Sequence, residues 1–147
     1  MIRYEMMSKE HVSQVAALEA QCFHTPWSEN AIGGELKNPL SAWFVALDGD
    51  QVVGYVGSQS VLGEADMMNL AVKDSYRRQG IAKQLIQSLI QRLSGAQVHS
   101  LSLEVRVSND AAISLYSQMG FLQVGRRPNY YTNPKEDAWI LRKEWEA

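Results

Sequence analysis

The stretch "NLAVKDSYRRQGIAKQLIQSLI", residues 69–90, decides the fold. Its apolar start completes a predicted strand over 65–73, and from Gly80 to about Leu93 apolar residues recur every four positions, which predicts a helix. Two arginines and a glycine occupy the turn between them. Free backbone N–H groups and the dipole at a helix N-terminus bind phosphate, and glycine lets the ligand come close. The sequence therefore predicts a strand, an anion-binding turn and a helix.

A second strand follows this helix. In "HSLSLEVRV" (99–107) apolar residues alternate with polar ones from Leu101 to Val107, as in a strand with one buried face. Strand, helix and strand over 64–107 thus form a crossover unit, which joins parallel strands with a right-handed connection.

Caps, turn residues and alternation predict the remaining elements, and the whole chain, 1–147, reads as one mixed α/β domain. In order, they are a strand over 2–7, a helix from Ser8 to about Cys22, a short helix from Ser28 to near Asn38-Pro39, a hairpin around 48–50, a helix capped by Asn109 and ended by Gly120, and strands over 121–127 and 136–145.

The composition excludes several classes of protein. A net charge of −2 with only short arginine pairs argues against nucleic-acid binding. No apolar run approaches the ~18 residues of a membrane span, and the N-terminus lacks a signal peptide's apolar stretch. One cysteine, Cys22, allows no internal disulfide and favours a cytoplasmic setting. It reads as a small hydrophobe rather than a nucleophile. The three histidines are too scattered to predict a metal site.

The anion-binding turn matches neither common nucleotide loop, because the chain contains no G-x-x-x-x-G-K-[ST] and no G-x-G-x-x-G. Instead, Arg77-x-x-Gly80-x-Ala82 resembles the acyl-CoA pyrophosphate loop of the GCN5-related N-acetyltransferase (GNAT) superfamily. "NLAV" (69–72) is similar to the strand before that loop, and "LEVRVSNDAAISLYSQMGF" (103–121) to the segment after it. The resemblance implies a mixed, mostly antiparallel sheet with a central parallel pair splayed around acetyl-CoA, flanked by about four helices.

The resemblance also implies how acetyl-CoA is held, with no metal. Backbone groups of Leu70, Ala71 and Val72 would bind the pantetheine arm like an added strand, and Asn109 would bond the cofactor further along. The pyrophosphate would lie on the loop made by Arg77, Arg78, Gln79, Gly80, Ile81, Ala82 and Lys83.

Two residues in the matching segments carry the chemistry of acetyl transfer. The resemblance makes Glu104 the general base, acting directly or through a water, and Tyr116 the general acid that protonates the leaving thiolate. From the pattern alone, Glu104 is equally a solvated side chain on a strand. Tyr116 falls on an apolar stripe, so core packing explains it as well.

A narrower resemblance concerns the acceptor. "PWSENAI" (26–32), "LYSQMGF" (115–121) and "NYYTNPKEDAWIL" (129–141), with "LEVRVSN" (103–109), resemble the bacterial ribosomal-protein-alanine N-acetyltransferases. This implies acetylation of the N-terminal alanine of a small-subunit ribosomal protein. Two alternatives stay open: an acetyltransferase for a polyamine, amino acid or antibiotic, and a catalytically silent acyl-CoA-binding module.

Three aromatic residues are candidates for the acceptor site. Tyr130 and Tyr131 lie in a segment rich in Pro, Asn and Thr, which predicts a loop, and could close around a peptide N-terminus or form a surface pair. Trp27 is expected to pack the first two helices together, while its loop contacts the acceptor.

Overall fold

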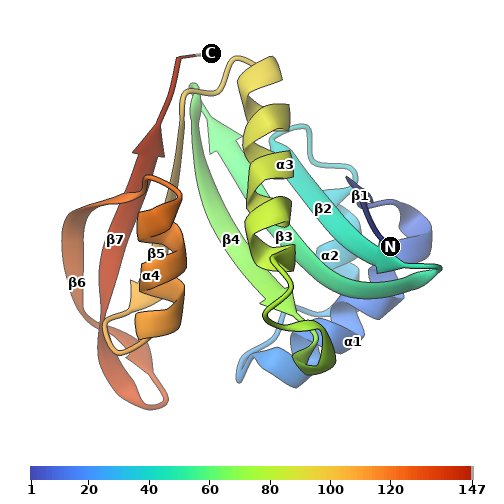
Figure 1. Ribbon diagram of the computed structural model, residues 1–147, viewed down its shortest axis with the longest axis horizontal. Coiled ribbons are helices and arrows are strands. Elements are labelled where there is room, and N and C mark those ends of the chain that lie inside the picture. Colours follow the sequence, from blue (N-terminus) through green and yellow to red (C-terminus); the bar gives the residue numbers. More distant parts are fainter. Residues whose placement is uncertain (147) are drawn as a thin grey trace.

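The computed structural model describes residues 1–146 and contains one seven-stranded sheet with helices on both faces (Figure 1). The strand order is β1-β2-β3-β4-β5-β7-β6. The strands are β1 (Ile2–Met6), β2 (Ser41–Asp48), β3 (Gln51–Val61), β4 (Glu64–Val72), β5 (Ser100–Arg106), β6 (Leu122–Thr132) and β7 (Lys135–Glu144). The α-helices are α1 (Val12–Cys22), α2 (Glu29–Glu35), α3 (Ile81–Gly95) and α4 (Asp110–Gln118), with 3₁₀ turns at Lys9–His11 and Asp74–Tyr76.

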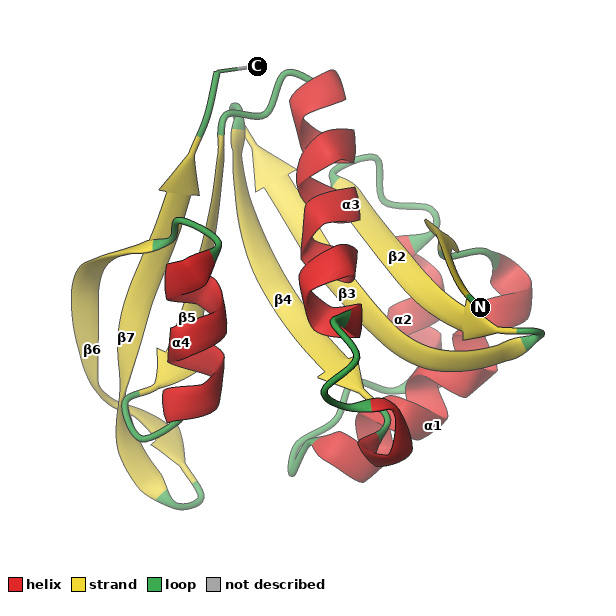
Figure 2. Cartoon of the chain, in the orientation of Figure 1, coloured by secondary structure: helices red, strands yellow, loops and turns green. Residues whose placement is uncertain are grey.

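Two hydrophobic clusters cover the two faces of the sheet. Alternate residues of β2 face opposite ways: Phe44 packs in the cluster that contains α3 and α4, and Val45 in the cluster that contains α1 and α2. Figure 2 shows α3 in front of the strands and α1 and α2 behind them. The sheet thus separates an α3/α4 face from an α1/α2 face.

The central strands β4 and β5 are parallel and stay together over a short distance only. They pair from Glu64 to Asp66 on β4 with Ser100 to Ser102 on β5. Beyond these positions the two strands diverge, as Figure 1 shows. The predicted parallel pair and its splayed end are both confirmed.

An irregularity in β4 lies where the strands part. Ser58 of β3 pairs with Met67, but the next residue, Gly57, pairs with Asn69, so Met68 is an extra residue, a β-bulge. The bulge changes the alternation of side chains: Met67 and Leu70 both pack on the α3/α4 cluster, whereas Asn69 turns to α1. At the opening, the bulge therefore places apolar side chains on the α3/α4 face and the amide of Asn69 on the α1/α2 face.

Three predicted elements differ in detail from the structure. The helix predicted from Ser8 is preceded by a 3₁₀ turn, so α1 begins only at Val12. The helix predicted to reach Asn38-Pro39 ends at Glu35, soon after two glycines, which are weak helix formers. The prediction that Tyr130 and Tyr131 lie in a loop is wrong, because both residues belong to β6. The Asn, Pro and Thr residues that suggested a loop lie in an irregular stretch of pairing between Arg127 and Tyr131 and in the tight β6–β7 turn that follows.

Candidate active site

The turn between β4 and α3 exposes a set of unpaired backbone donors. Among residues 1–146, the N–H groups from Arg78 to Lys83 have no hydrogen-bond acceptor, whereas the N–H of Gln84 bonds to the carbonyl of Gly80, 3.0 Å away. Arg78 and Gly80 both have positive φ angles, +64° and +77°, which turn the backbone into this shape. The loop is therefore an anion cradle at the N-terminus of α3.

Two further features of the cradle fit a phosphate. A Cβ built on Gly80 would meet no protein atom within 4 Å, so the space beside this residue is open. Arg78 and Lys83 are exposed, with their charges available to an anion. Arg77 differs, because its guanidinium binds Asp74 at 3.0 Å and the carbonyl of Val72 at 3.4 Å. Arg77 thus stabilises the conformation of the loop through contacts within the protein.

The divergence of the sheet frees one edge of β4. Leu70, Ala71 and Val72 pair with β3 on one side, but β5 has left the other side of this segment. An extended ligand can bond to such an edge as an added strand. Asn109 lies across the opening, at the start of α4, where its side-chain oxygen accepts a hydrogen bond from the N–H of Ala112 at 3.2 Å. Its predicted role as a helix cap is confirmed.

Glu104 projects from β5 on the α1/α2 face of the opening. Its neighbours Leu103 and Val105 are buried in the α3/α4 cluster, so the alternation of the strand directs Glu104 the other way. Its side chain is one-quarter exposed, and one carboxylate oxygen lies 3.6 Å from Nε of Arg127 on β6. The carboxylate can therefore be reached from solvent.

Tyr116 reaches the same opening from the other face. It is buried on α4, and its ring contacts Phe121 edge-on, with 5.5 Å between centroids. Within residues 1–146 its hydroxyl has no hydrogen-bond partner except the sulfur of Met67, 4.0 Å away across the opening. Burial, and secondarily the nearby Tyr131, raises the pKa of Tyr116 to about 12, so the phenol keeps its proton at neutral pH.

The two tyrosines of β6 stand beside this pair. Tyr131 is half-buried under the guanidinium of Arg106, 4.2 Å from the ring centroid. Burial raises its pKa to about 12, with smaller raising effects from Tyr130 and two carboxylates, and the charge of Arg106 acts in the opposite direction. Tyr130 packs perpendicular to it at 5.0 Å and is 48% exposed. Burial and the charge of Glu104 raise the pKa of Tyr130 as well. The structure thus brings the predicted base, the predicted acid and both tyrosines together.

The segment between α1 and α2 lines the α1/α2 face near the opening. Trp27 packs edge-on against Trp43 of β2, 5.7 Å between centroids, within the cluster shared by both helices and the sheet. Its expected packing role is thereby confirmed.

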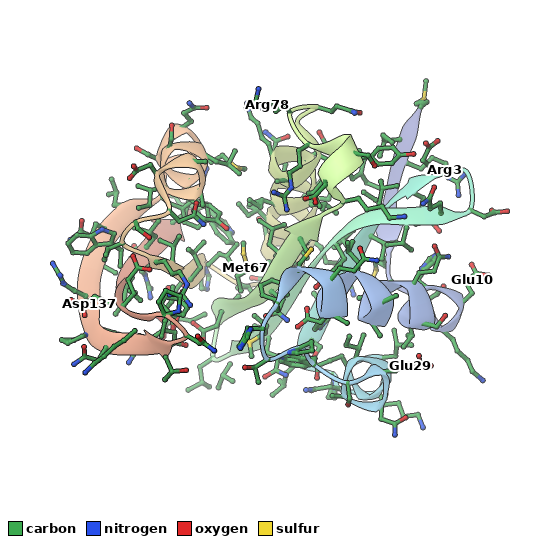
Figure 3. The ribbon with its side chains drawn as sticks, turned by 90° about the horizontal axis from the view of Figure 1, so that it is seen from below. Arg3, Glu10, Glu29, Met67, Arg78 and Asp137 are labelled. Atoms are coloured by element: carbon green, nitrogen blue, oxygen red, sulfur yellow. The ribbon has the colours of Figure 1, made fainter. Side chains whose placement is uncertain are left out.

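In Figure 3, Met67 lies between the half of the sheet that carries Asp137 and the half that carries α1.

Sequence reasoning missed two groups of residues here. Nδ2 of Asn133, in the β6–β7 turn, lies 2.6 Å from Nε2 of His24, so this turn and the α1–α2 segment touch. Glu19 of α1 is buried and bonds to Asn69 and Trp27. Neither group carries a motif, and His24 and Asn133 are 109 residues apart. Only the fold brings them together.

Within residues 1–146, no group of three His, Cys, Asp or Glu side chains could hold a metal ion, and no helix is long and apolar enough to cross a membrane.

The site at the opening of the sheet suits an enzyme that transfers an acyl group from a donor that carries phosphates. The chain belongs to the acetyltransferase (GNAT) family, whose model matches residues 5–121.

Curated relatives cover nearly all of the chain. It is 36% identical over 136 residues to the putative [ribosomal protein bS18]-alanine N-acetyltransferase of Bacillus subtilis, covering 92% of this chain and 90% of the relative. It is also 36% identical over 126 residues to the [ribosomal protein bS18]-alanine N-acetyltransferase of Escherichia coli, covering 84% of each. The crystal structure of the Escherichia coli ribosomal-protein-S18-alanine N-acetyltransferase superposes with a TM-score of 0.90 at 32% identity, covering 100% of this chain and 96% of that one.

Proposed function

We propose that this protein is an acetyl-CoA-dependent N-acetyltransferase that modifies the N-terminal alanine of ribosomal protein bS18. The observation that carries this proposal is the arrangement of Glu104 and Tyr116. They meet at the opening of the sheet from opposite faces, with the anion cradle on the same side as Tyr116. A base facing the acceptor and an acid facing the acyl donor are what transfer between two substrates needs. The names of the relatives described above support bS18 as the acceptor.

Acetyl-CoA fits the residues on the α3/α4 face. The unpaired N–H groups from Arg78 to Lys83 would bind its pyrophosphate, and the open space at Gly80 would admit it. The free edge of β4 over 70–72 would bond the pantetheine arm, and Asn109 would contact it further along. Arg77, Gln79, Ile81 and Ala82 would shape the loop. Bound acetyl-CoA supplies a thioester whose carbonyl carbon accepts the amine and whose thiolate leaves.

Glu104 and Tyr116 handle the two protons of this reaction. An N-terminal amine has a pKa of about 7.7–8.0, so near neutral pH much of it is a non-nucleophilic ammonium. Glu104 takes the proton of the amine, directly or through a water, from the α1/α2 face. Tyr116, with its pKa of about 12, donates its proton to the leaving sulfur from the other face.

The acceptor would enter between the α1–α2 segment and the β6–β7 hairpin. Tyr130 and Tyr131 would form one wall and the backbone around Trp27 the other, with Glu104 at the end of the path. The proposed substrates place the reaction in the cytoplasm, a setting that suits a chain with a single cysteine.

The experiment that tests the function measures thiol release from acetyl-CoA with three acceptors. They are a peptide with the N-terminal sequence of bS18 beginning at alanine, the same peptide with a blocked N-terminus, and spermidine. We expect turnover on the free peptide alone. Turnover on spermidine alone would retain the fold and the catalytic pair but replace the acceptor by a small amine. No turnover on any acceptor, with acetyl-CoA still bound, would favour a catalytically silent module.

Substitution of Gly80 tests the cradle separately. In Gly80→Val a branched side chain would occupy the phosphate path, and a φ of +77° is strained for a β-branched residue. We expect the dissociation constant for acetyl-CoA, measured by calorimetry, to rise by about 100-fold, in line with the loss of several charge-assisted hydrogen bonds. Gly95→Val, at the far end of α3 with open space around it, is the matched control. Equal affinity in Gly80→Val and the wild type would mean that the anion binds elsewhere.

A further inference from the structure

Glu19 is a buried carboxylate that takes no part in the proposed proton transfers. It lies on α1 with 1% of its surface exposed. It accepts hydrogen bonds from the hydroxyl of Tyr55, from Nδ2 of Asn69 at 2.8 and 2.9 Å, and from the backbone N–H of Trp27 at 3.0 Å. A buried carboxylate is costly unless its oxygens are satisfied in this way, so the three donors and Glu19 hold one another in place.

The donors come from three different elements, and two of them belong to the opening of the sheet. Asn69 directly follows the bulge at Met68, where β4 turns away from β5. Trp27 lies near the end of the segment 23–28, whose His24 reaches Asn133 on the β6–β7 turn. Tyr55 lies on β3, in the core. Glu19 therefore connects the strand at the acyl-donor site to the segment that lines the acceptor path.

We propose that Glu19 is a positioning residue for the acceptor. It fixes the α1–α2 segment relative to β4, and so sets the affinity for the peptide N-terminus without contacting it. This proposal rests on the proposed function. It concerns the acceptor alone, because Asn69 and Trp27 lie on the α1/α2 face, whereas the anion cradle lies at the start of α3 on the other face.

A second buried carboxylate provides a comparison. Glu35 of α2 is 9% exposed and accepts hydrogen bonds from Ser41, Trp43 and Gln59 at 2.9 to 3.1 Å. Its bonds join α2 to β2 and β3 and reach neither Asn69 nor the segment 23–28. Loss of Glu35 would thus remove a similar set of hydrogen bonds from the fold, but it would reach the acceptor path only indirectly, through the ring contact between Trp43 and Trp27.

The test compares Glu19→Gln with Glu35→Gln in steady-state kinetics with the bS18 peptide. Glutamine keeps the shape, but in either orientation its NH₂ group faces Nδ2 of Asn69, together with the hydroxyl of Tyr55 or the N–H of Trp27, and the facing N–H donors repel. For Glu19→Gln we expect the KM of the peptide to rise at least tenfold, kcat to stay within about threefold, and the dissociation constant of acetyl-CoA to be unchanged. For Glu35→Gln we expect a lowered melting temperature and a KM that changes much less than in Glu19→Gln.

Two results would overturn the proposal: an unchanged peptide KM in folded Glu19→Gln, or an equal rise in KM in Glu35→Gln. If Glu19→Gln does not fold, Asn69→Ala removes the donor on β4 without changing the buried charge, and the same KM rise is expected. An unchanged KM in Asn69→Ala would then reject the proposal. Failure of the proposed function is a separate outcome, because it would show as absent turnover of the peptide by the wild type.

Discussion

Glu104→Gln is expected to lower kcat for an N-terminal alanine peptide by about 10²- to 10⁴-fold at pH 7, the usual range for loss of a general base. The amide is close in shape to the carboxylate but cannot accept the proton of an ammonium. Since Glu104 faces away from the α3/α4 cluster, acetyl-CoA affinity should stay near the wild-type value. Thiol release measures the first effect and calorimetry the second.

The pH dependence of this variant gives a sharper test. An N-terminal amine with a pKa of about 7.7–8.0 is mostly neutral at pH 9, so less depends on the base there. We expect the deficit of Glu104→Gln to shrink between pH 7 and pH 9. Glu64→Gln is the control, because Glu64 lies on β4 at the closed end of the strand pair, bonded to Arg142. Wild-type turnover by Glu104→Gln at pH 7 would remove this residue from the mechanism.

The face of the sheet that carries Glu104 could be predicted because it depends on local periodicity. Alternation over 101–107 makes Leu103 and Val105 apolar neighbours of a polar residue, and the structure places them accordingly. In the same way, Gly80 and the apolar residues spaced four apart after it predicted the start and extent of α3. These features depend on residues close together in the chain.

The errors and omissions arise where distant segments meet. Tyr130 and Tyr131 have the loop residues Asn and Pro around them, yet pairing with β7 makes this segment a strand. The bulge at Met68 has no signature in its strand, because it depends on the register with β3. The bonds of Glu19 likewise join elements up to 50 residues apart. No local pattern carries such information.

Tyr116→Phe is expected to lower kcat by about 10²- to 10⁴-fold, because the leaving thiolate would lose its proposed proton donor on the α3/α4 face. The fold should persist, since the ring keeps its contact with Phe121 and the hydroxyl loses only a contact with the sulfur of Met67 at 4.0 Å. Substrate affinities should change little. Steady-state kinetics and the thermal midpoint test these expectations together.

Tyr131 provides the decisive comparison, because burial raises its pKa to about 12 as well and it stands near Glu104. If Tyr116 is the acid, Tyr131→Phe should change the KM of the peptide more than kcat, and a larger loss of kcat in Tyr131→Phe would reassign the role.

The raised pKa of Tyr116 also predicts a stability effect. A phenol held neutral in the folded state stabilises fully below its unfolded pKa of about 10, and this contribution is lost as pH rises through the folded pKa of about 12. Between pH 10 and 12 the wild type should therefore lose roughly 2 kcal/mol more stability than Tyr116→Phe, measured by urea unfolding.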